Sequence, residues 1–149
     1  MAAIRVSRRQ GFPLFGNTVE DSLGSIALLV IRLVFGYGIM LHGLPKIQNP
    51  FHWGDKSGLP PFLQLLAALA EFGGGLALIS GLFTRLGSLG ITITMLVAIF
   101  KAHAGMPFVA NGGGKSFESA ALYGAVALAF LIAGPGRISL DWKFFAEKD

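Results

Sequence analysis

Residues 22–42 read SLGSIALLVIRLVFGYGIMLH, an apolar stretch of 21 residues with one full charge, Arg32. An α-helix rises about 1.5 Å per residue, so about 20 apolar residues cross the ~30 Å hydrocarbon layer of a bilayer. The stretch shows no alternation of apolar and polar residues, and it is far longer than a strand. It therefore predicts a transmembrane helix.

Three further apolar segments repeat this pattern. Residues 61–83 hold one charge, Glu71, and residues 86–103 and 118–136 carry charges only near their ends. We therefore expect an all-α integral membrane four-helix bundle. The expected layout is a tail over 1–21, a membrane domain over 22–142 with helices at about 22–42, 61–83, 86–103 and 118–136, and a tail over 143–149.

The composition of the 149 residues supports a membrane protein: 53% are hydrophobic, 13% are charged, and the mean hydropathy is +0.64. Soluble domains carry about 25% charged residues. This excludes a disordered chain, an ordinary soluble enzyme and a nucleic-acid-binding domain. The lipid bilayer is thus the expected partner, together with other membrane subunits. Cysteine is absent from the sequence, which excludes disulfides, iron–sulfur ligation and cysteine nucleophiles.

Basic residues predict the orientation. The side with both termini holds seven of them and the opposite side four, which favours cytoplasmic termini in a plasma or equivalent inner membrane. The first group is Arg5, Arg8, Arg9, Arg85, Arg137, Lys143 and Lys148, and the second is Lys46, Lys56, Lys101 and Lys115. A faint internal similarity between residues 76–85 and 130–137 is compatible with two pseudo-repeated hairpins.

Two charges lie far inside the apolar segments. Arg32 is ten residues into the first segment and Glu71 twelve residues before the end of the second, so both are expected near mid-membrane. A lone central charge costs about 2.5–3.5 kcal/mol on insertion scales. We therefore predict a buried ion pair between Arg32 and Glu71. The pair either fixes helix register or handles a ligand or proton.

A second polar group gathers where the helices meet the long loops. Together its members could line a ligand pocket, or they could be interfacial side chains that reach toward water. No attachment motif supports haem between the two histidines, and no three-ligand set supports a metal. The candidates are His42, Lys46, His103, Glu118, Tyr37 and Tyr123.

The sequence resembles the DoxX family of small four-helix membrane proteins. The resemblance covers roughly residues 24–142 and rests on the order and spacing of several short motifs. These are RLVFG at 32–36, HGLPK at 42–46, AEFGGGL at 70–76, GLFTR at 81–85, the late His103 and Glu118, and GPGRISLD at 134–141. The resemblance implies an association with membrane-bound oxidoreductases and with thiosulfate:quinone oxidoreductase.

Three functions compete on this basis. The first is a quinone-facing membrane subunit of a redox complex, in which Arg32, His42, Glu71, His103 and Glu118 hold the headgroup and pass protons. It needs no intrinsic cofactor, because a partner would bring the electron carrier. The second is a non-enzymatic scaffold subunit of a larger complex, and the third is a small-molecule or proton carrier. The sequence shows no autonomous catalytic motif, so enzyme activity is left open.

Overall fold

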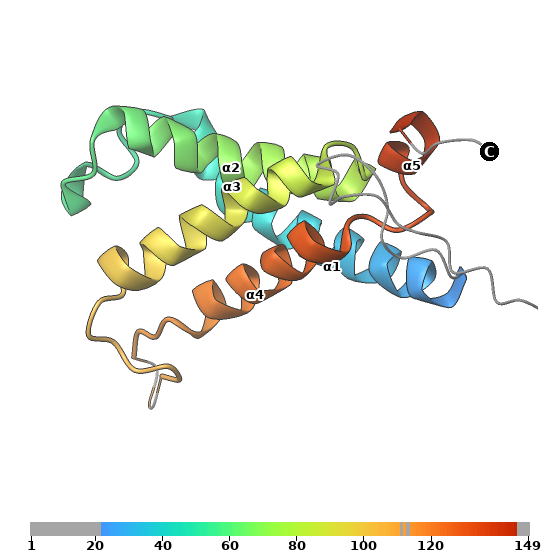
Figure 1. Cartoon of the computed structure of the whole chain (residues 1–149). Coiled ribbons are helices and arrows are strands. Elements are labelled where there is room, and N and C mark those ends of the chain that lie inside the picture. The colour runs from blue at the N-terminus through green and yellow to red at the C-terminus, as the bar shows by residue number, and fades with distance from the viewer. Residues whose placement is uncertain (1–21, 111, 113, 146–149) are drawn as a thin grey trace, which may run out of the picture.

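The computed structural model describes residues 22–110, 112 and 114–145. Helices dominate these residues and no strand occurs among them, so the predicted all-α membrane bundle is confirmed (Figure 1). The predicted tail over 1–21 lies outside the described residues. In chain order the elements are α1 (Ser22–Gln48), the 3₁₀ helix η1 (Asp55–Ser57), α2 (Pro61–Ser80), α3 (Thr84–Val97), the π-helix η2 (Ala98–Ala102), α4 (Glu118–Ala133) and α5 (Leu140–Phe145).

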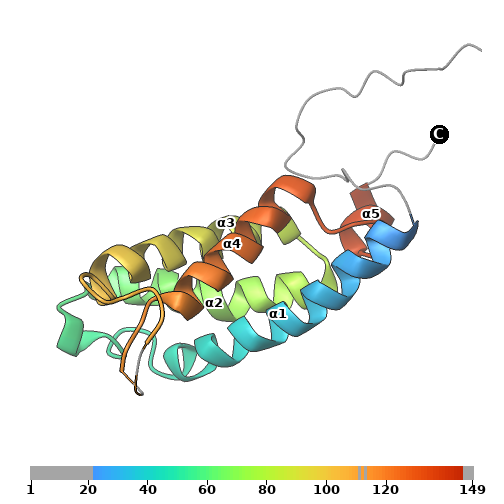
Figure 2. The same ribbon diagram turned by 90° about the horizontal axis from the view of Figure 1, so that it is seen from below.

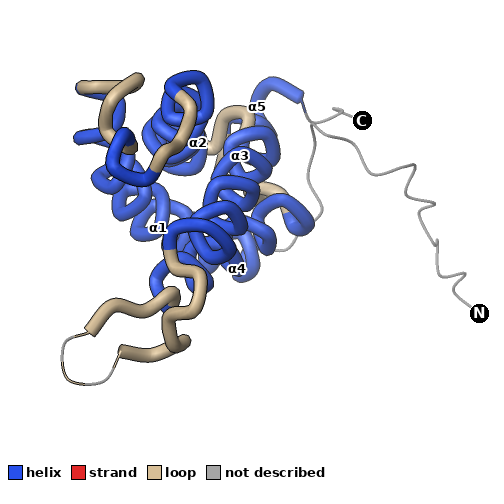
Figure 3. Tube along the Cα trace, turned by 90° about the vertical axis from the view of Figure 1, so that its left-hand side faces the viewer, coloured by secondary structure: helices blue, strands red, loops and turns tan. Residues whose placement is uncertain are grey.

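The helices form two antiparallel hairpins, α1 with α2 and α3 with α4, and α2 packs on α3 between them (Figure 2). Helices α1 and α4 make few contacts with each other, so this side of the bundle is the loosest. Seen from the left-hand side of Figure 1, helices α1, α2, α3 and α4 lie side by side (Figure 3). All of these helices contribute to the core. Its buried apolar residues are Phe35, Ile39, Leu78, Ile91, Met95, Ala120, Ala127 and Phe130.

The two ends of the bundle differ. The loops over 49–60 and 103–117 lie together at one end, here called the loop end (Figure 1). The turn between α2 and α3 and the segment after α4 lie at the opposite end, here called the terminal end. Among the described residues, three helical stretches are long and apolar enough to cross a membrane: Ser22–Gln48, Pro61–Ser80 and Thr84–Ala102. Helix α4 is apolar but shorter.

Helix bounds differ from the predicted ones where local chemistry decides them. Helix α1 continues to Gln48 with Pro45 inside it, six residues beyond the predicted end. Helix α2 ends at Ser80 because Gly81 adopts a left-handed conformation, with φ 69°, and its N–H bonds back to Ala77. Helix α4 ends at Ala133, since Gly134 leaves the helix and Pro135 follows.

The terminal end is closed by the segment after α4. Helix α4 has 16 residues, which is only about 24 Å, so the chain completes its path in non-helical backbone. Non-helical backbone at membrane depth is tolerated only where protein groups satisfy its hydrogen bonds. Arg32 supplies them: Nη1 donates to Pro135 O and Nη2 to Ile138 O, both at 2.8 Å.

Asp141, at the start of α5, completes this closure. Its carboxylate accepts hydrogen bonds from Phe83 N at 2.7 Å and Thr84 N at 2.9 Å, so it caps the N-terminus of α3 from a distant part of the chain. Asp141 also interacts electrostatically with Arg32 and Arg85. The three charged side chains are buried, and they tie α1, α3 and the C-terminal segment together.

Candidate functional site

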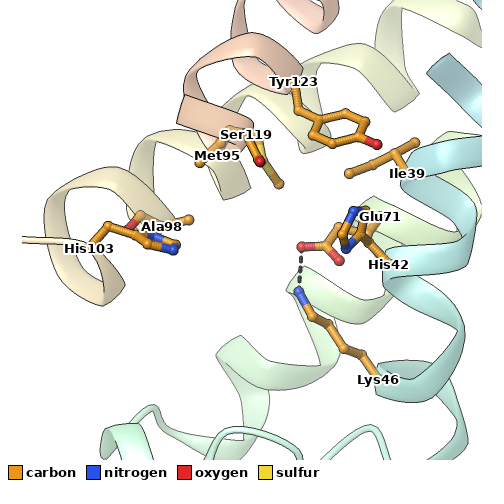
Figure 4. Close-up of a pocket in the computed structure, with 10 residues that line it drawn as sticks. Ile39, His42, Lys46, Glu71, Met95, Ala98, His103, Ser119 and Tyr123 are labelled. Carbon is orange, nitrogen blue, oxygen red and sulfur yellow. Dashed lines mark hydrogen bonds and ion pairs between the residues drawn. The ribbon is translucent and has the colours of Figure 1, made fainter. Parts of the chain in front are cut away.

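A polar cleft lies toward the loop end, between α1, α2, α3, η2 and α4 (Figure 4). Its volume is about 230 Å³. The close-up shows side chains from four segments directed toward one central space. The lining residues are Ile39, His42, Lys46, Glu71, Met95, Ala98, His103, Ser119, Ala120 and Tyr123.

Glu71 forms the floor of the cleft. It is the eleventh residue of the 20-residue helix α2, and only 2% of it is exposed. Helix α1 approaches closely here because Gly43 has no side chain, and a Cβ at Gly43 would overlap the backbone nitrogen of Phe72. The close approach brings the side chains of α1 within reach of the Glu71 carboxylate.

The partner of Glu71 is Lys46, and the predicted pair with Arg32 is wrong. Lys46 Nζ donates to Glu71 Oε1 at 2.5 Å, whereas Arg32 bonds to carbonyls at the terminal end. The prediction assumed that both charges lie at the same depth. In the structure Gly43 of α1 faces Glu71, and Arg32 is level with Gly81, where a Cβ would lie 2.8 Å from Arg32 Nη1. Ten residues of α2 separate these levels, which is about 15 Å.

The second carboxylate oxygen of Glu71 is the unusual atom of the cleft. Glu71 Oε2 is buried and has no hydrogen-bond partner among the described residues. An ionised carboxylate has acceptor sites on both oxygens, and leaving a buried acceptor unsatisfied costs about 1–3 kcal/mol. Glu71, a lining residue of the cleft, therefore keeps one buried acceptor oxygen without a donor.

Lys46 links the cleft to the loop above it. Its ammonium lies 4.6 Å from the centroid of the Trp53 ring, a cation–π contact, while it bonds to Glu71. Trp53 is held in turn, because its Nε1 donates to Gln64 O at 2.9 Å. The side chain of Lys46 therefore lies between the carboxylate of Glu71 and the indole of Trp53.

Gln64 fixes this loop on the first turns of α2. Its side chain is fully buried, and its Oε1 accepts from Gly54 N at 2.7 Å. Its Nε2 donates to Asp55 Oδ1 at 2.9 Å and to Leu59 O at 2.8 Å. The hydrogen bond from Gln64 lowers the pKa of Asp55, and His52, at 3.2 Å, acts in the same direction. The loop thus has a defined conformation over the cleft.

His103 enters from the opposite wall, directly after the π-helix η2. Its backbone N–H and its Nδ1 both point to Ala98 O, at 2.9 and 3.0 Å. A carbonyl can only accept, so Nδ1 carries the proton and Nε2 is left as an acceptor in the neutral ring. Short π-helical turns inside α-helices occur frequently at functional sites. Here the widened turn positions the imidazole at the cleft.

Tyr123 forms the wall on the α4 side. Its ring makes an edge contact with His42, with centroids 5.4 Å apart, and a tilted contact with Phe35 at 5.3 Å. Its hydroxyl lies against α1 at Gly38, where a Cβ would come within 2.7 Å of it. Gly38 thus leaves the room that the phenol occupies.

The sequence profile of the DoxX family matches residues 27–104, which include most of α1 and all of α2, α3 and η2. The chain belongs to the DoxX family. The matched range contains every charged or histidine side chain that lines the cleft, while Tyr123 lies outside it.

Three relatives of this DoxX protein come from bacteria. An uncharacterised protein of Haemophilus influenzae is 35% identical over 80% of this chain and 92% of the relative. The "Putative oxidoreductase CatD" of Bacillus subtilis is 29% identical over 83% and 90%, and the "Inner membrane protein YqjF" of Escherichia coli is 29% identical over 80% and 92%. No solved structure matches the chain. The family and these relatives support an integral membrane protein.

The structure brings some predicted site residues together and separates others. His42, Lys46, His103 and Tyr123 all line the cleft, and Glu71 joins them. Tyr37 does not: it is 57% exposed on the outer surface of α1. Glu118 begins α4 but is not among the lining residues.

Sequence reasoning missed the loop residue and the α2 residue that position Lys46. Trp53 and Gln64 lie 11 residues apart, and nothing in their spacing signals a shared loop contact. It also missed the π-helical turn before His103, which no apolar period reveals. The described residues contain no group of three or more His, Cys, Asp or Glu side chains that could hold a metal ion. The cleft can instead offer hydrogen-bond donors and acceptors to an organic headgroup.

Proposed function

We propose that this DoxX protein is a membrane subunit of a redox complex and that its cleft binds a quinone-type headgroup in the reduced, quinol form. The observation that carries this proposal is the buried, unpartnered Oε2 of Glu71 beside the Lys46 ammonium. A quinol carries hydroxyl donors, and a hydroxyl is the group that a free carboxylate acceptor binds.

The other polar groups of the cleft complement this assignment. His103 Nε2 offers a second acceptor on the opposite wall. Oxidation of a quinol releases two electrons and two protons. Glu71 and His103 are positioned to accept the protons, and a partner subunit carrying a redox cofactor would accept the electrons. The Bacillus subtilis relative that is named as an oxidoreductase is compatible with such a partner complex.

The test is direct binding to the purified protein in lipid nanodiscs. The chain has two tryptophans, so Trp142→Phe leaves Trp53, which contacts Lys46, as the fluorescent reporter of the cleft. A short-chain ubiquinol should quench this fluorescence saturably. Glu71→Gln should weaken binding at least about tenfold, since a hydrogen bond to a charged group contributes about 1.5–3 kcal/mol.

Glu118→Gln is the matched control, because it makes the same chemical change outside the cleft lining. It should leave the affinity unchanged. Absence of saturable quenching, or equal effects of the two substitutions, would contradict a quinol site and favour a scaffold role.

We also propose that both termini lie in the cytoplasm. The support is the excess of basic residues in the segments that lie on the same side of the membrane as the two termini. Because the chain has no cysteine, single cysteines can be introduced cleanly. A cysteine at Ser57 or Ser116 should react with an impermeant thiol reagent in intact cells, and one at Ser7 should not. The reverse labelling pattern would overturn the orientation.

A further inference from the structure

An apolar groove opens on the side of the bundle where α1 and α4 make few contacts. Its volume is about 420 Å³, and its lining is almost wholly apolar. Val34, one of its lining residues, is 72% exposed. The lining residues are Val30, Ile31, Val34, Phe35 and Tyr123.

Tyr123 is a wall of both this groove and the polar cleft. Its ring touches His42, a cleft residue, and Phe35, a groove residue. The two spaces thus share Tyr123 as a lining residue.

The sizes of the two spaces fit one ligand with two parts. Small-molecule sites usually measure about 300–1,000 Å³, and the cleft alone, at about 230 Å³, falls below that range. Cleft and groove together fall within it. The cleft combines the polar groups of Lys46, Glu71 and His103 with apolar side chains, whereas the groove is lined almost entirely by aliphatic and aromatic carbon. A molecule with a polar head and an apolar tail complements both.

We infer that the groove between α1 and α4 holds the apolar tail of the ligand, and that the headgroup reaches the cleft sideways from the lipid, past Tyr123. This inference rests on the proposed function, because it requires a headgroup site at Glu71. The alternative exit leads past Lys46 and His103 to the loop end, where the tail would meet water, and exposed apolar surface is unfavourable there. The ligand class is therefore a single-tailed lipid-phase molecule.

The test compares two quinol probes with the same headgroup, one with a single isoprene unit and one with a long isoprenoid tail, in nanodiscs. Val34→Trp fills the groove from a position that is already exposed, so the fold should tolerate it. Leu33→Trp is the matched control on the same helix, since Leu33 is 44% exposed but does not line the groove. Val34→Trp should lower the affinity for the long-tailed probe about tenfold and leave the short probe unaffected. Leu33→Trp should change neither affinity.

Photo-crosslinking gives a readout that is independent of affinity. A long-tailed probe with a diazirine on the tail should label the peptide that contains residues 30–35, and excess unlabelled quinol should abolish the labelling. Equal effects of the two tryptophan variants on the long-tailed probe, or labelling that competitor does not displace, would overturn the tail assignment while leaving the headgroup site intact. If neither probe binds the parent protein, both the proposed function and this inference fail.

Discussion

Buried charge occurs at both ends of the bundle, but it is used differently at each. At the terminal end, both terminal nitrogens of Arg32 donate to backbone carbonyls, while its buried Nε has no partner among the described residues, and both oxygens of Asp141 accept from backbone N–H groups. In the cleft, Glu71 has one oxygen paired with Lys46 and the other buried without a partner among the described residues. Charged groups bonded mainly to backbone indicate architecture. A half-satisfied carboxylate beside a cavity indicates a site.

The two ends also differ in what a charge would do if its partner were lost. Arg32 is 2% exposed and is enclosed by protein, so its bonded carbonyls would have no substitute. The Lys46 side chain is 25% exposed and already contacts Trp53, so it could turn toward the mouth of the cleft. The same chemical substitution should therefore cost much more at the terminal end.

The largest predicted effect tests this difference. Arg32→Gln removes two charge-assisted hydrogen bonds, each contributing about 1.5–3 kcal/mol, so the free energy of unfolding should fall by about 3 kcal/mol or more. Glu71→Gln should lower it by only about 1 kcal/mol, because the Lys46 ammonium can be solvated in the open cleft. Chemical unfolding of both variants in detergent micelles provides the measurement. Equal losses would show that the cleft carboxylate is as architectural as Arg32.

The next effect concerns the helix contact that places Glu71. Gly43→Ala puts a methyl group into the backbone of α2, and overpacking of this kind costs about 1–3 kcal/mol. Gly73→Ala is the control, because a Cβ at Gly73 meets nothing within 4 Å. The control should be neutral or stabilising by up to about 1 kcal/mol, since alanine favours a helix over glycine. Thermal melts in detergent would separate the two. A stable Gly43→Ala variant would show that α1 and α2 can move apart freely.

The sequence predicts the bundle well because the apolar segments are long and their number and order follow from hydropathy. The chain's charges were harder to place, because depth in a bilayer depends on where each helix ends. Pairing Arg32 with Glu71 took 22–42 as a complete span. In the structure α1 is 27 residues long and is set against α2 so that Glu71 faces Gly43. Lys46, which was assigned to the interfacial cluster, thereby becomes the partner of Glu71.

The candidate site was likewise predictable only in part. Histidines, a lysine and a tyrosine near helix ends could be grouped from the sequence, because ends on one side of a bundle lie close together. Which of them face inward depends on helix rotation, and Tyr37 and Tyr123 show opposite outcomes. The position of the Lys46 side chain depends on the loop over 49–60, which hydrogen bonds from the buried Gln64 side chain hold in place. Such a tertiary contact leaves no period in the sequence.

A smaller effect separates the true ion pair from the false one. In a double-mutant cycle, Lys46→Met and Glu71→Gln should be non-additive by about 1 kcal/mol, within the 0.5–3 kcal/mol typical of contacting residues. Arg32→Gln and Glu71→Gln should add to within about 0.5 kcal/mol, because they lie at different levels of the bundle. Unfolding free energies of the single and double variants supply both couplings. Strong coupling of Arg32 to Glu71 would restore the pair predicted from the sequence.

The smallest predicted effect lies in the loop that covers the cleft. The hydrogen bond from Gln64, assisted by His52, lowers the pKa of Asp55 below its ordinary value of 3.8. A carboxyl group whose pKa is lower in the folded state stabilises the fold above its unfolded pKa, and this contribution is lost as the pH falls through the folded value. Asp55→Asn keeps an acceptor oxygen for Gln64 but removes the titration. The melting temperature of the parent should therefore exceed that of the variant by a small constant amount above about pH 5, and the gap should close as the pH falls below 3.8. Melting curves between about pH 3 and pH 7 measure it, and a gap that persists to the lowest pH would show that the charge on Asp55 does not help to hold the loop over the cleft.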